Sequence, residues 1–167
     1  MKTKFFCLFF VVVILSIGLS CSSDASENPT SGASSPIVLN YSYSQDELET
    51  MAIINTYRQS KGLNSLERIN HVSYKSEEHD NYMIANNVVN HDDFVARSEN
   101  IIKVLGAIKV SENIAYNYKS SQEAFDAWMN SPLHRENIEG DFTHFGLSIR
   151  ENPVNGRKYY TNIFVKM

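Results

Sequence analysis

Cysteine is scarce in this chain of 167 residues: there are two, Cys7 and Cys21, and both lie within its first 21 positions. The rest of the chain therefore has no disulfide, no thiolate metal ligand and no thiol nucleophile. Its stability must come from a hydrophobic core, and about 125 residues are enough to build one.

An excess of positive charge is also absent. The chain has 15 Lys and Arg against 19 Asp and Glu, a net charge of −4. The first 20 residues contain Lys2 and Lys4 and no acidic residue, so without them the balance is 13 against 19, or −6. Because nucleic-acid binding requires clustered Lys and Arg, we do not expect nucleic acid as a partner.

Several sequence motifs that identify a cofactor or a reaction are missing as well. The chain has no internal repeat, no glycine-rich phosphate loop, no CxxC pair and no pair of histidines at HExxH spacing. Function must therefore be sought in residues that are far apart in the sequence.

The first 20 residues have the pattern of an export signal. Lys2 and Lys4 precede an almost wholly apolar run from Phe5 to Leu19, which is short for a membrane span. Residues 21–43 are rich in Ser and Pro, which predicts a flexible tether.

The junction ILSIGLSC, which ends at Cys21, resembles a bacterial lipoprotein signal, with Gly18 where leucine is usual. We expect cleavage before Cys21 and a lipid on its thiol, which would anchor the protein to a membrane of the cell envelope without a transmembrane helix. An ordinary signal peptide, leading to secretion, and an uncleaved anchor are the alternatives. We expect the mature protein to lie outside the cytoplasm, either anchored to a membrane of the cell envelope or secreted.

Residues 44–167 read as one folded domain. A capping box at Ser44–Glu47 opens a first helix that ends at Lys61-Gly62. The patterns further predict helices over 69–88 and 94–105, a strand over 112–118, a helix that starts at 120 or 121, contains Trp128 and Met129 and is ended by Pro132, and a hairpin of 145–149 and 159–165 around an Asn-Gly turn. Few strands and segregated helices indicate an α+β domain with an antiparallel sheet.

Two histidines and one glutamate have unusual settings. His91 follows the second predicted helix, His134 follows the helix that contains the single tryptophan, and Glu112 opens an otherwise apolar strand. Two imidazoles with a carboxylate nearby suit Zn²⁺ or a similar divalent ion. Glu112 would be either a direct ligand or the acceptor that fixes an imidazole tautomer. The alternative is that these side chains satisfy one another as packing residues.

The residues INTYR, GLNSL, ENIA, AWMNSPLHRENI and FTHFGLSI, together with His91 and Phe94, resemble the bacterial branch of the CAP superfamily. This superfamily comprises cysteine-rich secretory, antigen 5 and pathogenesis-related proteins. The resemblance covers residues 46–167. It implies an α-β-α sandwich with a central antiparallel sheet flanked by helices, and a cleft on one side.

The resemblance also implies a set of cleft residues. His91 and His134 match the two family histidines, and Glu112 matches the first of two acidic residues. The second acidic position is Ser131 here, as is usual in bacterial relatives, so the set of four is incomplete. We expect His91, Glu112, His134 and Ser131 to line a ligand site, with His91 and His134 as metal ligands.

We therefore expect an extracytoplasmic binding module rather than an enzyme, with a small molecule, a lipid or an envelope component as its ligand. Some relatives bind sterols or other lipids, and the aromatic residues of the second half suit either a groove or a core. A hydrolase in which a metal ion assists cleavage of envelope peptides or glycans is one alternative. A structural envelope domain is the other.

Overall fold

The computed structural model describes residues 36–167, which lie within one compact unit. The predicted signal, Cys21 and most of the predicted tether lie outside the described residues. Nine elements follow one another along this part of the chain: α1 (Gln45–Ser60), β1 (Glu67–Arg68), α2 (Asn70–Asn86), α3 (Phe94–Leu105), β2 (Lys109–Tyr116), α4 (Ser121–Asn130), α5 (Pro132–Glu139), β3 (His144–Glu151) and β4 (Lys158–Lys166).

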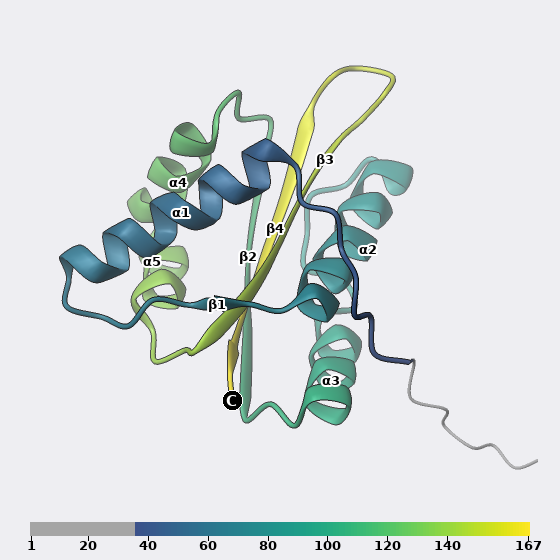
Figure 1. Cartoon of the computed structure of the whole chain (residues 1–167). Helices are drawn as coiled ribbons and strands as arrows, with labels where there is room; N and C mark the ends of the chain where they lie inside the picture. Colours follow the sequence, from purple (N-terminus) through teal and green to yellow (C-terminus); the bar gives the residue numbers. More distant parts are fainter. Residues whose placement is uncertain (1–35) are drawn as a thin grey trace, which may run out of the picture. The chain divides into compact units, whose positions relative to one another are not determined.

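The four strands form one sheet in the order β1-β3-β4-β2. The pairs β3–β4 and β4–β2 are antiparallel, and the two-residue β1 runs parallel to β3. Helices α2 and α3 cover one face of the sheet, and α1, α4 and α5 cover the other (Figure 1). The α-β-α sandwich expected from the sequence is confirmed.

Each face of the sheet has its own hydrophobic cluster. The larger one lies between the sheet and α1, α4 and α5, and includes Trp128, Phe145 and Phe164. The smaller one lies under α2 and α3 and includes Val72 and Ile163. Side chains alternate along each strand, so neighbouring residues of one strand belong to different layers.

Helix α2 lies directly on strand β3 at Gly146. A Cβ atom at this glycine would lie 2.3 Å from the backbone nitrogen of Ser73 and 2.4 Å from the carbonyl carbon of Val72. Only the absence of a side chain permits this approach of helix backbone to strand backbone.

Two elements were not predicted from the sequence. Strand β1 has two residues, too few for a periodic pattern. Helix α5 begins at Pro132, in a stretch between the predicted tryptophan helix and the predicted hairpin. Proline does end α4, but it also suits the first position of a new helix because that position needs no N–H donor. His134 therefore lies in the first turn of a helix.

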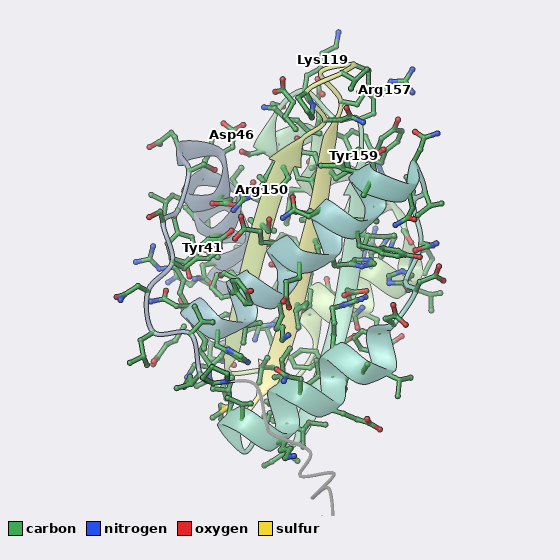
Figure 2. All side chains as sticks on the ribbon, turned by 90° about the vertical axis from the view of Figure 1, so that its right-hand side faces the viewer. Tyr41, Asp46, Lys119, Arg150, Arg157 and Tyr159 are labelled. Atoms are coloured by element: carbon green, nitrogen blue, oxygen red, sulfur yellow. The ribbon has the colours of Figure 1, made fainter. Side chains whose placement is uncertain are left out.

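The other elements agree with the predictions within a few residues. The capping box of α1 is present, with the Ser44 side chain accepting from Glu47 N. Strand β2 begins three residues before the predicted strand. The hairpin loop between β3 and β4 includes Gly156 at a φ of 70°, and Arg157 lies at this end of the molecule (Figure 2).

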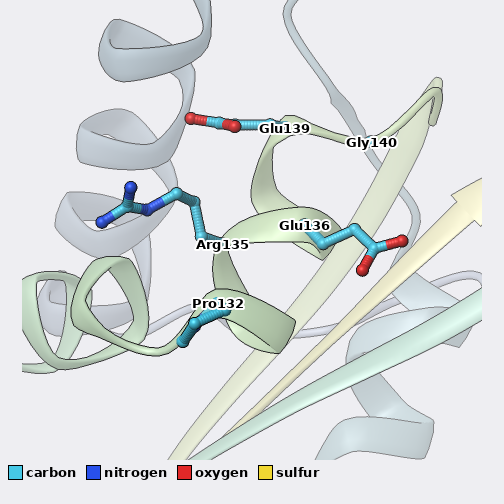
Figure 3. A pocket seen from close by; sticks show the side chains of 5 residues that line it. All are labelled: Pro132, Arg135, Glu136, Glu139 and Gly140. Carbon is cyan, nitrogen blue, oxygen red and sulfur yellow. The ribbon is translucent and has the colours of Figure 1, made fainter.

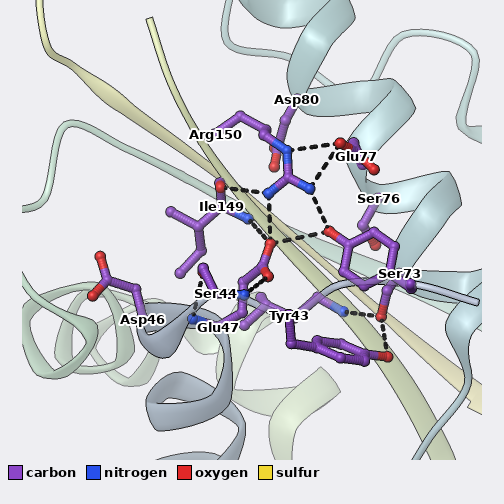
Figure 4. A network of polar contacts seen from close by, with 12 residues as sticks. Tyr43, Ser44, Asp46, Glu47, Ser73, Ser76, Glu77, Asp80, Ile149 and Arg150 are labelled. Carbon is purple, nitrogen blue, oxygen red and sulfur yellow. Dashed lines mark hydrogen bonds and ion pairs between the residues drawn. The ribbon is translucent and has the colours of Figure 1, made fainter.

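The segment before α1 is held by a buried polar network (Figure 4). Glu47, which has no exposed surface, accepts from Arg150 Nη1 at 2.7 Å and from Tyr41 Oη at 3.0 Å. Arg150 Nη2 in turn donates to Tyr41 Oη at 2.7 Å. The last residues of the predicted tether are thus hydrogen-bonded to α1 and β3.

Candidate functional site

The polar triplet Ser111-Glu112-Asn113 on β2 contacts both of the segments that carry the predicted site histidines. Because side chains alternate along a strand, Glu112 faces α2 and α3 while Ser111 and Asn113 face α5. Ser111 Oγ lies 2.5 Å from Asn137 Oδ1, and Asn113 Nδ2 donates to the carbonyl oxygen of His134 at 2.9 Å. Since β2 is an edge strand, elements of both helical layers meet at this edge.

Glu112 accepts hydrogen bonds from two cationic or polar side chains. Its Oε1 lies 2.8 Å from His91 Nδ1 and 2.9 Å from Arg97 Nη2, and its Oε2 lies 3.0 Å from Arg97 Nε. The contact with Arg97 is therefore a bidentate ion pair, and both partners are largely buried.

The charge of Glu112 is stabilised in this setting. Burial alone would raise its pKa, but the hydrogen bonds from His91 and Arg97, together with the charge of Arg97, outweigh burial and lower the pKa below the ordinary glutamate value. Glu112 is therefore a carboxylate at neutral pH. Its Oε1 accepts from both His91 and Arg97, and its Oε2 accepts from Arg97, so Glu112 is placed to fix the tautomer of His91.

His91 is the more exposed of the two site histidines. Its side chain is 49% exposed, and its Nδ1 faces the Glu112 carboxylate. A carboxylate can only accept, so Nδ1 carries a proton, and in the neutral ring Nε2 carries a lone pair. Within residues 36–167, Nε2 has no hydrogen-bond partner, so it is available to a ligand.

His134 is half-buried in the first turn of α5. Burial lowers its pKa, and a positive charge on His91, when that ring is protonated, lowers the pKa further. The ring is therefore neutral at neutral pH, and it lies within electrostatic range of His91. Its ring nitrogens have no hydrogen-bond partner in the described part of the chain, so a lone pair remains for a ligand.

Ser131, predicted at the rim, lies between α4 and α5. Its N–H donates to Trp128 O, and its carbonyl accepts from Arg135 N. Its hydroxyl makes no hydrogen bond to any residue of 36–167 and does not cap α5. Its place in the ligand site stays a prediction.

The side chains present at this edge of the sheet limit how a metal ion could be coordinated. Within residues 36–167 there is no group of three or more His, Cys, Asp and Glu side chains that could hold one. His91 and His134 each offer an imidazole donor, and Glu112 is placed to fix the tautomer of His91. Water or a second ligand would complete the coordination of a bound ion.

Two residues of this cluster were not predicted from the sequence: Arg97 and His79. His79 is buried, and its Nε2 lies 4.0 Å from Glu112 Oε1. A signal for each existed, because His79 falls on the buried face of α2 between Val72 and Met83, and Arg97 lies one turn before the buried Ile101. A polar side chain at a core position of a helix indicates a buried partner.

A hollow of about 430 Å³ lies on another side of α5 (Figure 3). Five residues line it: Pro132, Arg135, Glu136, Glu139 and Gly140. Arg135 and Glu136 point in different directions there, and His134 is not among the lining residues. This hollow is separate from the histidine pair.

No helix within residues 36–167 has both the length and the apolar character needed to cross a membrane.

Comparisons with known proteins agree with this architecture. The family model described as "CAP: Cysteine-rich secretory protein family" matches residues 51–165, which include His91, Glu112 and His134. A stretch of 59 residues is 41% identical to the uncharacterized membrane protein YlbC of Bacillus subtilis (strain 168). That stretch is 35% of this chain and 15% of YlbC, so the match covers a small part of that protein.

Two solved structures share the fold at low sequence identity. One is an extracellular protein containing an SCP domain from Bacillus anthracis, with a TM-score of 0.64 and 23% identity over 73% of this chain and 40% of that one. The other is an outer surface protein of Borrelia burgdorferi, with a TM-score of 0.66 and 18% identity over 77% of this chain and 98% of that one.

Proposed function

Because the chain belongs to the cysteine-rich secretory protein (CAP) family, we propose that it is an extracytoplasmic binding module whose site is the histidine pair His91 and His134. Glu112 orients the first of these imidazoles. The observation that carries the proposal is the bond between His91 Nδ1 and Glu112 Oε1 at 2.8 Å, which leaves the exposed Nε2 as an acceptor or a metal ligand.

The location outside the cytoplasm is supported by two independent observations. Structures with this fold include a protein described as extracellular and one described as an outer surface protein. The sequence adds the pattern of an export signal followed by Cys21. A lipid on Cys21 would hold the module at a membrane surface.

A divalent ion of the zinc type suits this pair better than Ca²⁺ or Mg²⁺. The free donors are imidazole nitrogens, whereas Ca²⁺ and Mg²⁺ require several oxygen ligands. When bound, the ion would supply a positive charge and open coordination positions that attract an anionic or carbonyl-bearing ligand. Of the protein groups, His91 and His134 would hold it, and Glu112 would hold the Nδ1 proton of His91.

Calorimetric titration of the purified protein with Zn²⁺ tests this function. We expect one binding site in the wild type and a large loss of affinity in both His91→Ala and His134→Ala. His144→Ala is the matched control, because His144 is partly buried and contacts Thr143 and Glu67 rather than the pair. A wild type without binding, together with lower melting temperatures in the two variants, would show that the histidines only pack.

A further inference from the structure

The chain segment that carries His91 is held on both sides by buried side chains. On one side, His79 Nε2 lies 2.8 Å from the carbonyl oxygen of Asn90. On the other side, Arg97 Nη1 donates to the carbonyl oxygen of Asp92 at 2.6 Å. The carbonyl groups immediately before and after His91 are thus both fixed, one from α2 and one from α3.

The protonation state of His79 suits it to donate a hydrogen bond to the carbonyl oxygen of Asn90. Its side chain has no exposed surface, and burial lowers its pKa, although the nearby Glu112 charge opposes this shift. In the neutral ring the carbonyl of Asn90 can only accept, so Nε2 carries the proton. Its Nδ1 is buried without a hydrogen-bond partner in the described part of the chain. Within the described residues, the bond to Asn90 is therefore the one hydrogen bond that this buried ring makes.

Arg97 links the segment to the carboxylate that His91 contacts. Its Nε and Nη2 hold Glu112, and its Nη1 holds Asp92. One planar guanidinium thus fixes both the acceptor of the His91 Nδ1 proton and the backbone that follows His91. Arg97 therefore acts on both partners of the contact between the imidazole and the carboxylate.

Side chains on either side of His91 also hold the chain segment that carries it. Asn90 Nδ2 donates to Asp92 Oδ2 at 2.8 Å, and Tyr82 Oη donates to the same oxygen at 2.8 Å. The ring of Tyr82 stacks on that of His79, with 5.9 Å between centroids. Asp93 follows with a φ of 58°, in the left-handed region that a non-glycine residue seldom adopts. This turn directs the chain from His91 into α3.

We propose that His79 and Arg97 are positioning residues that set the direction of His91 Nε2 toward its ligand. This inference rests on the proposed function of the histidine pair. Neither side chain needs to touch the ligand, because both act through the backbone on either side of His91 and, for Arg97, through Glu112. Partners of this kind around a metal-bound histidine typically change metal affinity by about 10-fold to 100-fold.

The test compares His79→Phe with His71→Phe. Both residues are buried histidines of α2, and phenylalanine keeps the ring volume in each. His71 contacts Val38 N and Asn100 Oδ1, which are not part of the His91 segment. We expect His79→Phe to lower Zn²⁺ affinity about tenfold and His71→Phe to leave it unchanged. Equal affinity in the wild type and a folded His79→Phe protein, or equal losses in both variants, would overturn the proposal.

A second readout does not depend on metal. Long-range ¹H–¹⁵N spectra report which nitrogen of His91 carries the proton. We expect the Nδ1–H form in the wild type and in His71→Phe, and a mixture of tautomers in His79→Phe and Arg97→Lys. If the wild type binds no Zn²⁺ while these spectra change as expected, the binding function fails and the positioning role stands. An unchanged His91 spectrum in both site variants refutes the positioning role.

Discussion

At the scale of single residues, the ionisation of Glu112 links binding geometry to stability. Its pKa is lower in the native state than the ordinary value of 4.5. A carboxyl group of this kind stabilises the fold above its ordinary pKa, and the stabilisation is lost as the pH falls through the native pKa. The same charge keeps Arg97 paired in the interior.

Glu112→Gln should therefore destabilise the protein at pH 7 by about 3 kcal/mol, because Arg97 would be left without its counter-charge. The difference from the wild type should shrink as the pH falls below 4.5 and through the lower native pKa, because the wild-type carboxylate then takes up a proton. Urea denaturation between pH 3 and pH 7 measures both effects. A constant difference across this range would contradict the role given to the charge.

The pKa of Asp80 is shifted in the opposite direction from that of Glu112. It has no exposed surface, its Oδ1 accepts from Thr161 Oγ1 at 2.6 Å, and its Oδ2 is unpartnered within residues 36–167. Burial raises its pKa well above 3.8, against the lowering effect of the Thr161 hydrogen bond. The native state therefore retains a proton that the unfolded chain releases, and stability falls as the pH rises above 3.8 toward the native pKa.

We expect Asp80→Asn to be more stable than the wild type at pH 7 and close to it near pH 4. The amide keeps the acceptor for Thr161 and never ionises. Thermal unfolding at the two pH values checks this expectation, with Asp126→Asn on the exposed face of α4 as the control. If the stability of Asp80→Asn relative to the wild type were lower at pH 7 than at pH 4, the expectation would be contradicted.

At the scale of elements, the contact between α2 and β3 depends on Gly146. A methyl group there would meet backbone atoms of Val72 and Ser73, which have no flexible end that could move aside. Gly146→Ala should therefore cost about 3 kcal/mol of unfolding free energy. Gly62→Ala has open space around the new methyl group but a φ of +73°, and should cost about 1 kcal/mol. Chemical denaturation that ranks the two variants in the reverse order would contradict this account.

Helix α5 depends on a buried cation of α1. Arg58 has no exposed surface and donates to the carbonyl oxygens of Ile138 at 2.7 Å and Gly140 at 3.0 Å. Its Nε also donates to Asn64 O at 2.8 Å. Because α5 carries His134, this contact stabilises one half of the site from the opposite end of the helix.

The predicted and observed elements show which parts of the fold and of the site could be predicted from the sequence alone. Helices α1 and α3 were predicted within about a residue because each has a clear terminal signal: Ser44 with Glu47 opens α1, and Gly106 ends α3. Helix α5 was missed because its eight residues bury only Ile138, so no apolar stripe marks it. His91, Glu112 and His134 were identified, but Arg97 and His79 belong to helices whose pairing with β2 is set by tertiary packing rather than by any local pattern.

At the scale of the whole molecule, attachment to a membrane is predicted to depend on Cys21. Cys21→Ala should move the protein from the membrane fraction of cells to the soluble fraction, because it removes the thiol that would carry the lipid. Cys7→Ala, within the apolar run of the signal, is the matched control and should stay in the membrane fraction. Retention of the Cys21→Ala protein in the membrane fraction would show that an uncleaved segment anchors it.

The central claim is that two imidazoles from opposite sides of the sheet form one binding site at the edge of β2. Protein labelled with ¹⁵N in its five histidines tests it most directly, by following all of the ring signals as one equivalent of Zn²⁺ is added. We predict that the ring nitrogens of His91 and His134 shift together while those of His71, His79 and His144 keep their positions or move slightly. If His91 and His134 do not respond, or if only one of them does, the claim of a shared site is wrong.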